Sequence, residues 1–145
     1  MDGINNNYRR VCRITVVSKS IILSELDKQE LVKYAEAEKP YESCAILVGN
    51  ENAEAWLVKK IFLTENTSNS EITFTISPDK EFEVDQIAKD MNMEIVCIFH
   101  SHPESEAYPS ETDKKFMEVN PFPWIIYSGE TKKMNCFILE NENIE

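Results

Sequence analysis

Ile95-Val96-Cys97-Ile98-Phe99-His100-Ser101-His102-Pro103 is the stretch around which the chain is organised. Its five apolar residues predict a buried strand, and the only two histidines of the chain follow at the end of that strand. Two histidines placed at random in a chain of this length would lie one residue apart in about one sequence in seventy. The pair alone is therefore a modest signal, and its weight depends on what surrounds it.

Alternation along a strand places His100 and His102 on the same face and Ser101 on the other, so both imidazoles can converge on one metal ion. Asp113 falls in the first turn of the helix expected next, and a tight loop could return its carboxylate to the histidines. Two histidines, a carboxylate and a water are the ligand set of a catalytic zinc site. Ser110 and Asp113 also fit a simple helix N-cap with an acidic first turn, and the two interpretations are compatible.

Composition excludes several classes of function. The 145 residues carry 26 Asp and Glu against 15 Lys and Arg, a net charge of -11 without any basic block, so nucleic acid is not an expected partner. The polar N-terminus lacks the apolar core of a signal peptide, and no apolar run approaches the ~20 residues that cross a bilayer. We therefore expect a cytoplasmic protein without membrane contact. The four cysteines form no Cys-x-x-Cys pair, and three of them, in apolar surroundings, are expected to be small core residues.

One domain is expected over 11–140, preceded by a flexible lead-in at 1–10 and followed by a frayed tail at 141–145. Helices are predicted from Ser24 to Pro40, from Asp79 to Met91, and from Ser110 to Asn120. The first would direct Leu26 toward the core, the second has Phe82 and Met91 at helical spacing, and the third has Val119 among its apolar residues. Strands are predicted at 13–17, 44–48, 55–63, 72–76, up to His100, at 124–127 and at 135–139, with a turn at Gly49-Asn50. This order indicates an α/β or α+β fold, a mixed sheet with helices packed against it.

These residues together resemble the JAMM (MPN-plus, JAB domain) zinc metalloprotease family, over most of the chain from Glu42 to Ser128. The family pattern is a glutamate before a short apolar strand, then His-x-His-Pro, six residues, Ser, two residues and Asp. Here it reads Glu42-Ser43-Cys44-Ala45-Ile46-Leu47, His100-Ser101-His102-Pro103 and Ser110-Glu111-Thr112-Asp113. The Trp124–Ser128 segment is similar to the prokaryotic and archaeal single-domain branch. The resemblance implies a JAB/MPN-like mixed sheet flanked by helices, in a layer architecture like that of cytidine deaminases.

Transferred residue by residue, the resemblance implies that His100, His102 and Asp113 bind one zinc ion per chain. It makes Glu42 the general acid/base and Ser110 the group that stabilises the oxyanion. Without the resemblance, Glu42 would be assigned to the surface, as most glutamates are. Ala45 departs from the glycine of many members, and Glu104-Ser105-Glu106 is more acidic than the usual approach to the serine.

The implied activity is that of a zinc-dependent isopeptidase or peptidase that hydrolyses the bond after the C-terminal Gly-Gly of a ubiquitin-like modifier, as a deubiquitinase or desampylase does. The alternatives are a peptidase acting on a sulfur-carrier-protein adduct and a non-catalytic MPN scaffold. A zinc deaminase is excluded because neither His-x-Glu nor Pro-Cys-x-x-Cys occurs. The expected partner is a ubiquitin-like protein, whose tail would add a strand near Thr64 to Thr75. A homodimer is compatible with the sequence.

Overall fold

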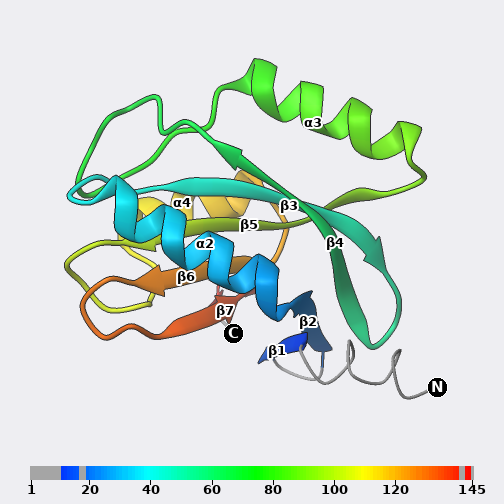
Figure 1. Ribbon diagram of the computed structural model, residues 1–145, viewed down its shortest axis with the longest axis horizontal. Coiled ribbons are helices and arrows are strands. Elements are labelled where there is room, and N and C mark those ends of the chain that lie inside the picture. The colour runs from blue at the N-terminus through cyan, green and yellow to red at the C-terminus, as the bar shows by residue number, and fades with distance from the viewer. Residues whose placement is uncertain (1–10, 17–18, 141–142, 145) are drawn as a thin grey trace.

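The structure is a computed structural model that describes residues 11–16, 19–140 and 143–144 (Figure 1). The described helices are α2 (Glu25–Glu38), α3 (Pro78–Asp90) and α4 (Glu111–Val119). The strands of the main sheet are β1 (Val11–Val16), β2 (Lys19–Ser24), β3 (Cys44–Glu51), β4 (Ala55–Thr64), β5 (Glu94–His102), β6 (Trp124–Ser128) and β7 (Met134–Phe137). A separate short pair joins β8 (Leu139–Glu140) to β9 (Asn143–Ile144).

The main sheet is mixed, with the strand order β1-β2-β4-β3-β5-β6-β7 among the described residues. β2 runs parallel to β4 and β5 runs parallel to β6, whereas the other neighbours are antiparallel. The apolar strands β3 and β5 lie side by side in the interior of the sheet, where both faces are covered. The predicted mixed sheet flanked by helices is therefore confirmed.

The helices cover the two faces of the sheet unequally. Leu31 and Ala35 of α2 pack on one face, in the core cluster that contains Leu47 of β3 and Phe99 of β5. α3 and α4 pack on the other face, with Val84, Ala88 and Met117 in the cluster that contains Ile46 and Ile98. Figure 1 shows α2 crossing the near face while α4 lies behind the sheet. A site on the α3 and α4 face is thus separated from α2 by the sheet.

Each described helix begins after a serine whose hydroxyl oxygen accepts a hydrogen bond from a backbone N–H of the first turn. Ser24 caps α2, as predicted, and Ser110 caps α4, as predicted. Ser77 caps α3, whose first residue is Pro78, where the missing N–H costs no hydrogen bond. The local sequence therefore determines where these helices begin.

Two predicted elements were wrong and one strand was missed. The segment 72–76 is not a strand: its backbone bonds to Asn66 and Thr67 and not to a neighbouring strand. Gly49-Asn50 is not a turn but continues β3 across an irregularity in register, where a Cβ on Gly49 would lie 1.7 Å from the carbonyl oxygen of Leu57. β2 was missed entirely. Long-range pairing with β4 turns this short segment into a strand.

Leu26, predicted to lie in the core, is exposed, and so are three other apolar residues of the predicted helices, namely Phe82, Met91 and Val119. At about 100° per residue, Leu26 lies about 140° around α2 from the buried Leu31, and Phe82 lies about 160° around α3 from the buried Val84. The prediction of buried free cysteines is confirmed for Cys44, Cys97 and Cys136. The side chain of Cys12 and the lead-in at 1–10 lie outside the described residues. No helix among the described residues is long and apolar enough to cross a membrane.

Glu36 joins the end of α2 to β6 and to the segment that follows β6. Its carboxylate accepts hydrogen bonds from the hydroxyl of buried Tyr127, at 2.7 Å, and from Lys132, at 2.9 Å, and it pairs with Lys39 at 2.8 Å. The hydrogen bonds with Lys39, Tyr127 and Lys132 lower the pKa of Glu36 to about 2. The charged carboxylate thus stabilises the packing of α2 against β6.

We expect Glu36→Gln to lower the free energy of unfolding at pH 7 by about 1 kcal/mol, a figure reduced for the solvent-exposed part of the side chain. Because the pKa of Glu36 is lower in the folded state, its contribution is present above the ordinary glutamate value and is lost as the pH falls toward 2. Chemical denaturation at pH 7 and pH 3 should show the difference between wild type and variant shrinking at pH 3. Glu38→Gln on the same helix is the control, and an equal loss in that variant would contradict the prediction.

Candidate metal centre

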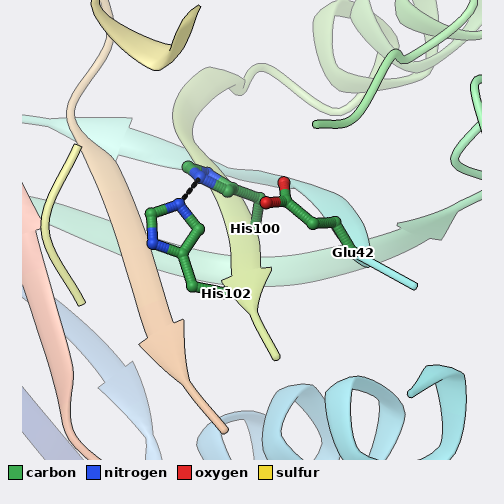
Figure 2. Close-up of side chains that lie close together, drawn as sticks. All are labelled: Glu42, His100 and His102. Carbon is green, nitrogen blue, oxygen red and sulfur yellow. Dashed lines mark hydrogen bonds between the residues drawn. The ribbon is translucent and has the colours of Figure 1, made fainter. Parts of the chain in front are cut away.

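His100 and His102 lie on the face of β5 that is turned toward α3 and α4, and both are almost completely buried, at 0% and 4% exposure. The ring of Phe74 stacks on His100 with 4.6 Å between centroids, and the ring of Trp124 lies edge-on to it at 5.6 Å. The two imidazoles point toward each other, as Figure 2 shows, with 3.1 Å between their Nε2 atoms. The predicted convergence of the two histidines is present.

Asp113 completes this convergence from the first turn of α4. Its Oδ2 atom lies 3.2 Å from Nε2 of His100 and 3.0 Å from Nε2 of His102. A capping box holds it there: Ser110 N–H donates to Oδ2 at 2.9 Å, and the Asp113 N–H donates to the Ser110 hydroxyl at 3.1 Å. Asp113 thus takes part in the cap of α4 and also approaches both histidines. The sequence had left open whether one residue does both.

These three atoms have the spacing that a tetrahedral metal requires. Zinc bonds of 2.0–2.2 Å place neighbouring ligand atoms about 3.3 Å apart, close to the distances among the two Nε2 atoms and Oδ2. Two imidazoles and a carboxylate are also the donor types that zinc prefers. The residues therefore fit a zinc ion.

Glu42 is the fourth group of the site. It is 3% exposed and precedes β3, and its carboxylate lies beside His100 in Figure 2. One carboxylate oxygen and one nitrogen from each histidine lie within 4.8 Å of one another. Glu42 Oε1 has no hydrogen-bond partner among the described residues, which is costly for a buried polar atom. The surface position that the residue type alone predicts is wrong, and the burial points to a ligand or a water at this oxygen.

Two ligand sets are thus conceivable, His100 and His102 with Asp113 or with Glu42. The set with Asp113 has ligand spacings of 3.0–3.2 Å, whereas the atoms of the set with Glu42 are only known to lie within 4.8 Å. We favour Asp113 as the ligand because its spacing matches zinc without rearrangement. The looser approach of Glu42 suits contact through a water.

The protonation preferences of the group follow from its burial. Burial raises the pKa of Glu42 to about 8 and lowers that of His100. Burial also opposes ionisation of Asp113, but the contacts with both histidines hold its pKa below the ordinary value. For His102, burial is outweighed by Asp113 and by the Glu106 carbonyl, so its pKa is raised. In the metal-free protein, burial thus disfavours ionisation of Glu42, whereas the contacts with the histidines favour ionisation of Asp113.

Several residues that the sequence did not single out support this geometry. The buried hydroxyls of Ser43 and Ser101 lie 2.9 Å apart, and the Ser43 N–H donates to Ser101 Oγ at 2.9 Å, on the face opposite the histidines. His102 Nδ1 lies 2.8 Å from the carbonyl oxygen of Glu106, which orients the imidazole. Alternation along the strand, which placed Ser101 away from the histidines, could have indicated the contact between Ser101 and Ser43. No sequence pattern indicated the contact between His102 and the Glu106 carbonyl.

Ser110 lies at the edge of the site, partly buried. Its hydroxyl oxygen accepts from the Asp113 N–H, and the hydrogen of the same hydroxyl has no acceptor among the described residues. Ser110 can therefore cap α4 and still donate a hydrogen bond outward.

Comparison with known proteins finds relatives of this chain among peptidases and similar folds among solved structures. Desampylase of Pyrococcus furiosus is 32% identical over 102 residues, which cover 70% of this chain and 69% of that protein. CysO-cysteine peptidase of Mycobacterium tuberculosis is 29% identical over 85 residues, which cover 59% of this chain and 57% of that protein. The solution structure of a Desulfitobacterium hafniense protein has a TM-score of 0.74 at 23% identity, covering 83% of this chain and 85% of that one, and supports the fold alone.

The family described as prokaryotic homologs of the JAB domain matches residues 27–139. This range contains Glu42, both histidines, Ser110 and Asp113, and it covers more than three quarters of the sequence. The chain belongs to the family of prokaryotic homologs of the JAB domain.

Proposed function

We propose that the chain is a zinc-dependent metallo-isopeptidase or peptidase that hydrolyses the bond after the C-terminal Gly-Gly of a ubiquitin-like modifier. The observation that carries this proposal is the convergence of His100, His102 and Asp113 beside the unpartnered carboxylate oxygen of Glu42. The relatives named desampylase and CysO-cysteine peptidase support a hydrolase acting on such protein tails.

One zinc ion per chain would be held by His100, His102 and Asp113. Bound there, zinc would lower the pKa of a water ligand to about 7 and polarise the substrate carbonyl. The carbonyl of Glu106 would keep His102 oriented toward the ion, and the capping box would keep Asp113 in place.

The chain's own residues carry the proton transfers. Glu42 accepts the proton of the attacking water through its free oxygen and returns it to the leaving amine. The Ser110 hydroxyl, whose hydrogen is uncommitted, donates to the oxygen on which negative charge develops. The burial of Glu42 and the histidines excludes bulk water and strengthens these interactions.

The substrate tail would lie along the loop from Thr64 to Thr75. The loop is not the strand that the sequence predicts, but the N–H groups of Thr73 and Phe74 donate to no acceptor among the described residues. An extended glycine tail pairs with such free backbone groups. The cytoplasmic location, the homodimer and the domain bounds 11–140 stay predictions.

We expect Thr73→Pro to raise KM for the Gly-Gly substrate about tenfold, because proline removes the N–H that would pair with the tail. Thr73→Val keeps that N–H and is the control. Thr75→Pro is a poorer test because the Thr75 N–H already donates to Asn66 within the loop. Unchanged KM in a folded Thr73→Pro protein would place the tail elsewhere.

The proposal is tested by incubating the zinc-loaded protein with a ubiquitin-like protein joined through Gly-Gly either to a lysine side chain or to the α-amine of an amino acid. Mass spectrometry of the products should show cleavage directly after Gly-Gly, lost on chelation and restored by zinc. Cleavage of the α-amine adduct alone would favour the sulfur-carrier alternative. No cleavage of either substrate by a protein that holds one zinc would favour the non-catalytic scaffold.

A further inference from the structure

Asn66 is a buried hydrogen-bonding centre of the loop that follows β4, with 7% exposure. Its Nδ2 group donates to the carbonyl oxygens of Glu42 at 3.0 Å and Thr73 at 3.1 Å. Its Oδ1 atom accepts from the Ser68 N–H at 3.1 Å, the Ser68 hydroxyl at 2.7 Å and the Thr75 N–H at 3.0 Å. One side chain thus connects both arms of the loop to the residue before β3.

Glu42 depends on this loop for its backbone position. β3 begins only at Cys44, and the N–H of Glu42 donates to the Ser70 carbonyl at 2.9 Å, while its carbonyl accepts from Asn66. Both backbone groups of Glu42 are therefore bonded to the loop and not to the sheet. Because Oε1 of the same residue has no partner, hydrogen bonds of the carboxylate do little to fix where it lies.

The same loop also reaches the metal ligands. Phe74 follows Thr73, and its ring stacks on His100 at 4.6 Å with 22° between planes. Since the Asn66 amide bonds the Thr73 carbonyl and the Thr75 N–H, it holds the backbone on both sides of Phe74. The loop therefore contacts both the carboxylate residue and an imidazole of the site.

We propose that Asn66 is a positioning residue that sets the distance between Glu42 and the histidine pair through the backbone carbonyl of Glu42. The kinetic effect that we expect rests on the proposed function, whereas the structural effect rests on the hydrogen bonds alone. Misplacement of a reacting group by about 1 Å can lower a rate about 100-fold, so loss of one buried hydrogen bond is enough to affect turnover.

The kinetic test compares Asn66→Ala and Asn66→Asp with the control Asn50→Asp, near the other end of β3. Asp at position 66 keeps the acceptor for Ser68 and Thr75 but cannot donate to the carbonyls of Glu42 and Thr73. Asn50→Asp removes only the amide bond to the Asn92 carbonyl. We expect kcat to fall about 10- to 100-fold in both Asn66 variants, with zinc content unchanged and any rise in KM smaller than the fall in kcat. The control should keep the wild-type kcat. A rise in KM at unchanged kcat, or an unchanged kcat in a merely less stable Asn66→Ala protein, would overturn the proposal.

The structural test needs neither zinc nor turnover. In the metal-free protein, amide hydrogen exchange followed by NMR should show the Glu42 N–H exchanging about tenfold faster in Asn66→Asp than in wild type. Asn50→Asp should leave that exchange unchanged. Unaltered exchange at Glu42 in Asn66→Asp overturns the positioning role even if the proposed hydrolysis is correct. Faster exchange in a protein whose wild type cleaves nothing would support the positioning role while contradicting the proposed function.

Discussion

Glu42→Gln is expected to abolish cleavage while leaving zinc bound. Glutamine has the same shape but cannot take a proton from water or return it to the leaving amine, a role that contributes about 10²- to 10⁴-fold to a rate. Glu42 is not among the three ligands we favour, so zinc content should stay at about one ion per chain. Single-turnover cleavage of the Gly-Gly substrate and metal analysis of the same preparation measure both quantities.

The control for this variant is Glu38→Gln, which alters an exposed carboxylate at the end of α2, four residues before Glu42. It should retain the wild-type rate, which excludes a general effect of reducing the negative charge near the site. Full activity in Glu42→Gln would contradict the mechanism. Loss of zinc together with activity would instead make Glu42 a ligand.

Removal of a ligand should abolish both zinc binding and cleavage. His100→Ala and His102→Ala each delete one of three atoms that lie 3.0–3.2 Å apart, and Asp113→Asn replaces the third by a neutral, weaker ligand. Two good ligands hold zinc far more weakly than three. We expect zinc content to fall from about one ion per chain to near zero, and activity to fall below detection. Metal analysis after dialysis, with the cleavage assay, measures this.

Glu111→Gln is the matched control for Asp113→Asn, because both carboxylates lie in the first turn of α4 and only Asp113 is buried. The control should keep its zinc. Chelation should lower the melting temperature of wild type and of the control but not that of the ligand variants, since only a protein that binds zinc is stabilised by it. Stoichiometric zinc in either histidine variant would show that the ligand assignment is wrong.

The parts of the site that local sequence encodes were predictable. The apolar strand ending in His100 and His102 has a strong pattern, and alternation alone places both imidazoles on one face. Ser110 and Asp113 are three residues apart, the spacing of a capping box, and the structure shows that the cap also directs the carboxylate. These features required no knowledge of strand pairing.

The place of Glu42 could not be derived from its surroundings in the sequence. It reaches the histidines because β3 pairs with β5 so that Cys44 lies opposite His100, a contact between residues far apart in the chain. The resemblance to the JAMM family indicated the role of Glu42, which the local sequence pattern did not. Strand order also depends on pairing between residues far apart in the chain, so it was not predictable from the sequence.

The loop after β4 shows why a strand-like pattern misled. The residues 72–76 alternate as a strand would, but the Asn66 side chain occupies the Thr73 carbonyl and the Thr75 N–H that a neighbouring strand would use. A buried amide that bonds the backbone in place of a strand leaves no periodic signal. The prediction of a strand at 72–76 thus failed in the loop that, in our proposal, positions Glu42.

Anomalous diffraction at the zinc absorption edge, from crystals of the purified protein, tests the central claim most directly. We predict one peak per chain, about 2.0–2.2 Å from Nε2 of His100, Nε2 of His102 and a carboxylate oxygen of Asp113, with Glu42 outside bonding distance. A peak bonded to Glu42 in place of Asp113, or zinc bound away from both histidines, would contradict the account.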